Sequence, residues 1–396
     1  MFLRNNRVVV LDLATGESVE EELPGGEGSK ARSSIELADA LAAKHGSDAI
    51  ILGTGILTGS FAPASCCGIV RAQGLSDAPS KVVPFMGFAG VELKLTGFDF
   101  MVIKGKSPEP AYVWARDGMI ELVASTALKG SDSWTRTDRI RSDQGDAKIQ
   151  VLSVGPWGDA RSPASQLVVN YWGGEDKLGI AAEWGRKNLL AIAFRGMGEL
   201  EVAEPEGHFE ESVLVMREHI ERLGRNEGLA SYAPSVARAD FRELVHRVVG
   251  CYGCPFPCRS FLKILEDPRE MRLVSKEPGY LHYDIAALDK AFGLGMDARG
   301  ATDFMIRCAR AGAEPVAALS LATASGSRPI QEDIASMLSA PPEASASEST
   351  GNFERSFESR DDYLRCIGLG LCPRYWSKAG FEEAFLTRLL GPAVGD

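Results

Sequence analysis

Three cysteines close together in the sequence have a spacing that suits metal binding. Cys251, Cys254 and Cys258 follow the pattern C-x2-C-x3-C in the segment GCYGCPFPC. Glycine permits close approach of the backbone and proline ends a helix, so a loop of this composition can aim several thiolates inward. We therefore expect these three cysteines to be ligands of an iron–sulfur cluster, which needs several converging thiolates.

A fourth ligand must come from elsewhere in the chain. Cys372, in the segment GLGLCP, is the first candidate, and Cys366 is the second. Zinc is the competing metal because four thiolates also suit it. Structural zinc sites usually carry two paired C-x2-C motifs, and the second pair is missing here, which favours iron–sulfur. Disulfide pairing or simple burial of the thiols is the remaining alternative.

The other cysteines carry weaker signals. Cys66 and Cys67 are adjacent, so they cannot easily bind the same metal, and we expect small buried thiols, with a reactive thiol as the alternative. Cys308 lies in a helical pattern and is expected in the core. A chain of 396 residues does not need disulfides for stability, so the eight cysteines favour reduced thiols in a cytoplasmic setting.

The overall composition excludes some classes of partner. The net charge is −11, so no general basic field would attract nucleic acid or anionic lipid. No apolar run approaches the roughly 18–20 residues of a membrane span. Residues 1–13 alternate basic and β-branched side chains and predict a first strand rather than a signal peptide. We expect a cytoplasmic protein without a membrane span.

The elements that would position these cysteines predict an α+β protein. Residues 1–205 are rich in predicted strands and are expected to form a β-rich domain, beginning with a hairpin over 7–23 and a helix over 33–44. Further strands are predicted at 49–52, 98–105, 111–115, 119–123, 149–155 and 189–194, the three at 98–123 as a meander. Residues 206–396 are predicted to be a mostly helical iron–sulfur domain. Its helices are expected at 206–229, 239–249, 285–292 and 303–311, and a mobile segment near 335–360.

Four segments resemble the motifs of one enzyme family in the same order. They are LGTGILTGSFAP at 52–63, GFAGVELKLTGFD at 87–99, SVGPWG at 153–158 and GRKNLLAIA at 185–193. Together with the cysteine motif, they resemble the tungsten-containing aldehyde:ferredoxin oxidoreductase family. The resemblance implies two sheets that hold a tungsten or molybdenum bis-pyranopterin, and a nearby 4Fe-4S cluster. It also implies oxidation of an aldehyde or related carbonyl to a carboxylic acid, with electrons passed to a ferredoxin-like carrier.

The resemblance also implies roles for individual residues. Glycines in the first two motifs would cradle the pterin with their backbone amides, and Lys177 would place a charge near its phosphate. Glu277 lies near the position of a glutamate that assists catalysis in the family, and His282 is a candidate for proton transfer. The four glycines are Gly55, Gly59, Gly87 and Gly90.

The chain departs from the family pattern at several positions. The family's first loop continues with GGR, but residues 65–68 read SCCG, which removes an arginine that could bind phosphate. Glu175 and Asp176 flank Lys177, and Phe292 and Ile367 stand where the family has aspartates. These changes indicate a shortened member with altered pterin motifs. The alternative function is a pterin-less paralogue that acts as an electron-transfer or assembly subunit. Either way we expect an oligomer or a hetero-complex.

Overall fold

The computed structural model describes residues 4–25, 33–73, 81–223, 236, 238–262, 280–282, 284–324 and 357–394. The candidate catalytic residue Glu277 and most of the segment near 335–360 lie outside the described residues.

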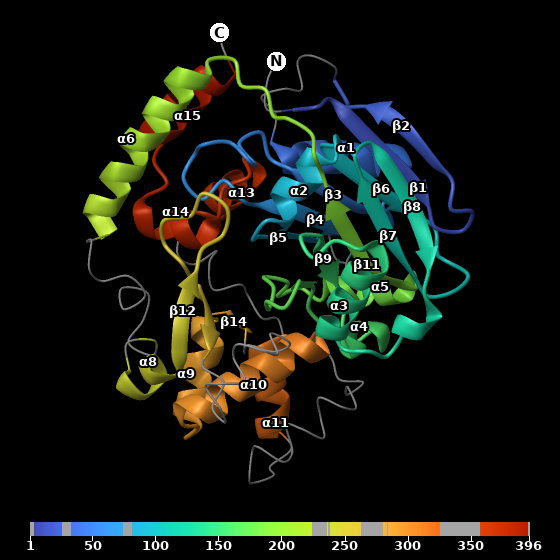
Figure 1. Ribbon diagram of the computed structural model, residues 1–396, viewed down its shortest axis with the longest axis vertical. Coiled ribbons are helices and arrows are strands. Elements are labelled where there is room, and N and C mark those ends of the chain that lie inside the picture. Colours follow the sequence, from blue (N-terminus) through green and yellow to red (C-terminus); the bar gives the residue numbers. More distant parts are fainter. Residues whose placement is uncertain are drawn as a thin grey trace.

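The first sheet has six strands in the order β2-β1-β6-β3-β4-β5. Strand β1 runs parallel to β6, and the other neighbours are antiparallel (Figure 1). The strands span Arg7–Asp12 (β1), Ser18–Glu22 (β2), Ile50–Thr54 (β3), Gly68–Ala72 (β4), Lys81–Phe85 (β5) and Phe100–Lys104 (β6).

Both faces of this sheet are buried, as β1 illustrates. Val8 and Val10 pack into a core shared with helices, whereas Val9 and Leu11 pack into a core shared with the second sheet. Alternate side chains of a strand point to opposite faces, so the run of apolar residues RVVVLD suits a strand covered on both sides.

The second sheet has five strands in the order β10-β9-β11-β7-β8. Its inner face meets the first sheet and its outer face packs in a core that includes Ile140 of helix α3. Its strands span Ala111–Arg116 (β7), Met119–Ala124 (β8), Gln150–Ser153 (β9), Val168–Val169 (β10) and Leu189–Arg195 (β11). The associated helices are a 3-10 turn at Thr126–Leu128 (η2) and helices at Ser133–Gln144 (α3), Pro156–Asp159 (α4) and Ile180–Arg186 (α5).

The predicted meander over residues 98–123 is wrong. Strand β6 lies between β1 and β3 in the first sheet, while β7 and β8 belong to the second. After β6 the chain crosses between the sheets, where the Ser107 amide donates to the Lys187 carbonyl at 3.0 Å. The order of the three strands in the sequence did not indicate that the first of them belongs to a different sheet.

Helices cover the first sheet on the side away from the second. Ser33 caps helix α1 (Ser34–His45) by accepting a hydrogen bond from the Ile35 amide at 3.3 Å. The C-terminal helices share a core with α1 and this sheet, although they lie in the region assigned to the second domain. These helices are Arg360–Gly368 (α13), Pro373–Ala379 (α14) and Glu383–Val394 (α15). A short helix at Ala89–Leu95 (α2) packs instead into the core on the opposite face of the first sheet.

The remaining helices belong to the second half of the chain. Helix α6 (Pro205–Leu223) lies along α15 (Figure 1). A separate core is formed by the helices Ala239–Leu244 (α8), Ile285–Gly293 (α9), Ala298–Ala311 (α10) and Pro315–Ala324 (α11). The α+β class with a β-rich first half and helices in the second is confirmed. Within the described ranges, no helix has the length and apolar character needed to cross a membrane.

A small third sheet was not predicted. Its order is β12-β13-β14, with strands at Val245–Val249, Arg259–Leu262 and Tyr280–His282. The helix expected over 239–249 is therefore wrong in its second half, where α8 ends and β12 begins. The β-branched residues Val245, Val248 and Val249 favour a strand once β13 is available to pair with it.

Candidate metal centre

The predicted ligand loop connects two antiparallel strands. It leaves β12 and enters β13, so Cys251, Cys254 and Cys258 lie in the connection of a β-hairpin. Gly253 has φ +61°, a left-handed conformation that favours glycine. The Ala64 amide donates to the Gly253 carbonyl at 2.9 Å, which fixes the loop against the N-terminal half.

Cys372 reaches the same place from the far end of the sequence. It immediately precedes α14, is buried, and its amide donates to the Ala64 carbonyl at 2.9 Å. Its thiol contacts the thioether of Met86 at 3.2 Å. Ala64 therefore binds both the hairpin loop and the segment that carries Cys372.

The four thiols act on one another electrostatically. Burial raises the pKa of Cys254, and the charges of Cys372, Cys251 and Cys258 raise it further. Burial raises the pKa of Cys258 to about 12; the guanidinium of Arg374 opposes this rise, whereas Cys251 and Cys372 add to it. Cys254 and Cys258 therefore both lie within electrostatic reach of Cys251 and Cys372.

Cys366 is placed differently from Cys372. Among the described residues, the thiols that act on Cys366 are Cys67 and Cys372, and not those of the hairpin loop. Its Sγ points to the Leu371 carbonyl at 3.6 Å. Of the two candidates for the fourth ligand, Cys372 is the one that the structure brings to the loop cysteines.

Two buried arginines flank the thiols. The Arg374 Nε donates to Glu175 at 2.6 Å, so its charge is paired. Arg259 directly follows Cys258, is 4% exposed, and lies over the Trp172 ring at 5.4 Å. Its Nε has no hydrogen-bond partner and no carboxylate of the described residues pairs with it. A buried cation without a counter-charge is costly, and an anionic group beside Cys258 would offset that cost.

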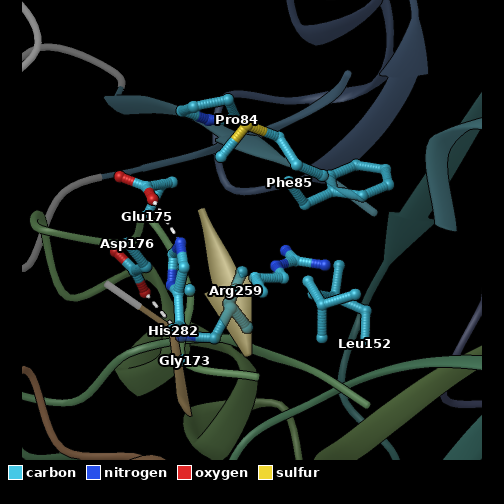
Figure 2. A pocket seen from close by; sticks show the side chains of 12 residues that line it. Pro84, Phe85, Leu152, Gly173, Glu175, Asp176, Arg259 and His282 are labelled. Carbon is cyan, nitrogen blue, oxygen red and sulfur yellow. Dashed lines mark hydrogen bonds and ion pairs between the residues drawn. The ribbon is translucent and has the colours of Figure 1, made fainter. Parts of the chain in front are cut away.

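His282 lies beside Arg259 on the neighbouring strand β14. Figure 2 shows it in a cleft, where its Nε2 lies 3.4 Å from a carboxylate oxygen of Glu175. Burial, and then the positive charges of Arg374 and Arg259, lower the pKa of His282 well below its ordinary value. The imidazole is therefore neutral at neutral pH, a state in which it could accept a proton.

The cleft in Figure 2 has apolar walls and a polar end. Leu152, Phe85 and Pro84 form part of the walls, Glu175, Asp176 and His282 lie together on the polar side, and Arg259 extends between them toward Leu152. The space not filled by atoms, counted out to the open mouth, is about 280 Å³.

Lys177 lies in a buried group of charges, which we name the Lys177 ion-pair cluster. Its ammonium contacts Asp284 and lies 2.5 Å from Glu314. Although burial alone would lower it, these two carboxylates raise the pKa of Lys177 above its ordinary value. Within the described structure its charge is already neutralised by protein carboxylates.

The four predicted cradle glycines pack against protein atoms. A Cβ on Gly55 would lie 2.1 Å from the backbone nitrogen of Gly370, and one on Gly90 would lie 2.8 Å from that of Gly68. Gly59 faces a Leu200 side chain and Gly87 faces Arg259. Their small size thus permits close packing of the chain on itself.

Sequence reasoning missed the charged partners of the thiols. Arg259 directly follows one ligand candidate and Arg374 lies two residues beyond another, which was a readable signal. Glu175 was noted only as a charge that would oppose phosphate; the structure pairs it with Arg374. The contacts of Ala64 with the hairpin loop and with the segment of Cys372 carried no sequence signal.

No group of three or more His, Cys, Asp or Glu side chains, within the ranges given above, converges on a point that a single metal ion could occupy. A cubane cluster differs from a single ion because each iron takes one cysteine. The four thiols therefore need to surround a volume rather than meet at one point.

Comparisons with known proteins match the N-terminal half of the chain. Residues 3–196 match the family model "Aldehyde ferredoxin oxidoreductase, N-terminal domain". The tungsten-containing aldehyde ferredoxin oxidoreductase of Pyrococcus horikoshii is 30% identical over 191 residues, which are 47% of this chain and 31% of that protein. The enzyme of Pyrococcus furiosus is 28% identical over 192 residues, again 47% and 31%.

A solved structure extends the likeness to the whole fold. The active site complex BamBC of benzoyl coenzyme A reductase, in complex with 1,5-dienoyl-CoA, matches with a TM-score of 0.69 and 17% identity. The match covers 98% of this chain and 64% of that one, and at this identity it concerns the fold alone. The alignment to the curated relatives spans about a third of their length. The resemblance predicted from the motifs is confirmed: residues 3–196 are similar to the N-terminal domain of aldehyde ferredoxin oxidoreductases.

Proposed function

We propose that this chain is an iron–sulfur redox protein whose cluster is a 4Fe-4S cubane held by Cys251, Cys254, Cys258 and Cys372. The observation that carries the proposal is that Ala64 binds both the hairpin loop of Cys251, Cys254 and Cys258 and the segment of Cys372, although these segments lie more than a hundred residues apart. Four cysteine thiolates are the ligand set of such a cluster. The cluster would supply one-electron transfer.

The charges around the thiols support a cluster. A cubane with four thiolates is anionic, and its net charge helps set its reduction potential. Arg259 is a buried cation with no carboxylate partner among the described residues, and it directly follows Cys258. Its guanidinium would offset part of the negative charge of the ligand set.

The hairpin loop also supports exchange of electrons with a partner. Cys251 and Cys254 are half-buried, and Gly253 between them is exposed. Phe88, 46% exposed, packs edge-on against Tyr252 beside the loop. We propose that a ferredoxin-like electron carrier or a partner redox subunit docks on this surface.

The tungsten or molybdenum bis-pyranopterin expected from the resemblance does not fit the described residues. On the side where a Cβ would stand, Gly55 and Gly90 meet backbone atoms, and Lys177 is neutralised by its own ion pairs. The cleft lined by Arg259 and His282 is small for two pterins. These observations favour the pterin-less electron-transfer or assembly subunit over an aldehyde oxidoreductase, which is the second candidate.

A pair of neighbouring substitutions tests the ligand assignment. Cys372→Ser should lose iron and the visible absorbance of the cluster, whereas Cys366→Ser should keep both, since its thiol faces the Leu371 carbonyl. Both cysteines are buried to a similar extent, which makes the second variant a matched control. Iron per chain and the electron paramagnetic resonance signal of the reduced protein are the readouts. Loss of iron from Cys366→Ser alone would overturn the assignment.

A further inference from the structure

Helix α6 lies at the outer edge of the molecule, and the charges on its inner side are balanced within the chain (Figure 1). Glu211 and Glu218 of α6 both pair with Arg388 of the neighbouring helix α15. In the last turn of α6, Arg222 pairs with Glu382, which directly precedes α15. These ion pairs leave no excess charge between the two helices.

The outer side of α6 carries an apolar patch. Val213 and Leu214 are exposed, and so is Phe209, which lies about one turn earlier. The Phe209 ring meets the exposed ring of Phe61 edge-on, with the two centroids 5.4 Å apart. Of the nine exposed large hydrophobic side chains in the described ranges, four therefore gather here. Single exposed apolar side chains are ordinary, but a cluster of them indicates an interaction surface.

Two charged residues, Glu210 and Arg217, flank this patch on either side. Both are exposed, and within the described part of the chain neither forms an ion pair. Residues 210, 213, 214 and 217 have the spacing i, i+3, i+4, i+7, which places them on one face of a helix. The midpoint between Val213 and Leu214 is also the midpoint between the two charges. At about 1.5 Å per residue, each charge lies about 5 Å from it along the axis.

We propose that the outer face of α6 is a contact surface between two copies of this chain, paired antiparallel about a two-fold axis at the midpoint of Val213 and Leu214. In this arrangement Glu210 of each copy lies opposite Arg217 of the other, and the apolar patches cover each other. A two-fold interface must be complementary to itself, and this order of charges meets that condition. A parallel pairing would place like charges opposite each other.

The acidic ends of the helix oppose this pairing only weakly. Glu206 and Glu221 are exposed and lie about 11 Å from the midpoint, one toward each end. Packed helices cross at an angle, so two copies of α6 have moved apart at that distance from the crossing point. Water and salt also screen the repulsion between exposed charges.

The self-association of the full-length protein, purified without oxygen, tests the inference. Sedimentation velocity over a wide range of concentration gives the Kd of the dimer. Glu210→Arg and Arg217→Glu each place like charges opposite each other, whereas the double variant exchanges the two charges and restores the pairing. Glu243→Arg is the matched control, because Glu243 is an exposed glutamate on another helix, α8. Circular dichroism checks that each variant is folded.

The wild type should form a dimer. Each single charge exchange should raise the Kd about tenfold or more, since two ion pairs per dimer change from attraction to repulsion. The double variant should return the Kd to near the wild-type value, and Glu243→Arg should leave it unchanged. A wild type that stays monomeric would leave this face to an unlike partner and overturn the inference. A dimer that the single variants do not weaken, or that the double variant does not restore, would also overturn it.

Discussion

Acid should weaken the packing that holds Cys372 in place, through the buried residue His219. His219 lies on α6 with its Nδ1 2.9 Å from the Tyr375 hydroxyl, and the Trp376 and Phe385 rings meet it edge-on. Burial, and then the charge of Arg222, lower the pKa of His219 from 6.5 to about 4. The folded protein therefore keeps this imidazole neutral at a pH where the unfolded chain would protonate it.

The sign and size of the effect follow from that difference. Because the unfolded state binds more protons between pH 6.5 and pH 4, the free energy of unfolding falls as the pH drops through this window. At about 1.4 kcal/mol per pKa unit, the full loss is about 3 kcal/mol, and about 2 kcal/mol of it is reached at pH 5. Helix α14 begins directly after Cys372, so the same loss should loosen the fourth ligand.

Urea unfolding without oxygen at pH 7.5 and pH 5 measures the effect. His219→Gln keeps a side-chain acceptor for the Tyr375 hydroxyl but does not titrate, so its stability should fall about 2 kcal/mol less than that of the wild type over this range. His246→Gln is the control, because His246 is exposed on β12. Equal pH dependence in the wild type and His219→Gln, or an equal effect of His246→Gln, would refute the reasoning.

Three further predictions concern the buried charges, the glycines and the loop surface. Lys177→Met should lower the free energy of unfolding in urea by about 3–5 kcal/mol, because it leaves the carboxylates of the Lys177 ion-pair cluster unpaired. Lys44→Met, which breaks a more exposed ion pair with Glu21, should lower it by no more than about 1 kcal/mol. Gly55→Ala should lower the melting temperature and the iron content together, since its Cβ would lie 2.1 Å from a backbone nitrogen; Gly293→Ala, with open space around it, should change neither. Phe88→Ser should slow reduction of the cluster by a protein electron donor, measured by stopped-flow absorbance, and leave reduction by dithionite unchanged.

Each of these predictions has a contrary result. Equal losses in the two lysine variants would mean that the buried ion pairs contribute no more than exposed ones. A stable, iron-loaded Gly55→Ala protein would mean that the close approach to Gly370 is not maintained in solution. Equal rates for wild type and Phe88→Ser would remove the loop surface as the docking site.

The elements that could be predicted from the sequence are those with strong local signals. The helix after Ser33 and the apolar strand β1 were predicted because patterns of apolar residues act over a few residues. The crossing between β6 and β7 was missed because sheet partners depend on contacts far along the chain. Helix α3 was missed because only Trp134 and Ile140 among its larger side chains are apolar, so it lacks a clear apolar stripe.

In the candidate site, too, local motifs could be predicted and contacts between distant residues could not. The spacing of Cys251, Cys254 and Cys258 indicated a thiolate site because its signal is contained in one short loop. The contacts of Ala64 with both ligand segments and the pairing of Lys177 with Asp284 depend on residues that the fold brings together. Such partners follow from tertiary packing, and a single sequence contains no local pattern that identifies them.

The most direct test of the proposed function is metal analysis of protein purified without oxygen. Iron, acid-labile sulfide, tungsten, molybdenum and zinc are counted per chain in the same sample. An iron–sulfur redox protein with a cubane cluster should give about four irons and four sulfides. Tungsten and molybdenum should be absent, because the cleft lined by Arg259 and His282 is small for two pterins and Lys177 is already paired with Asp284 and Glu314. Zinc without iron would contradict the iron–sulfur centre, and stoichiometric tungsten or molybdenum beside the iron would contradict the exclusion of the pterin.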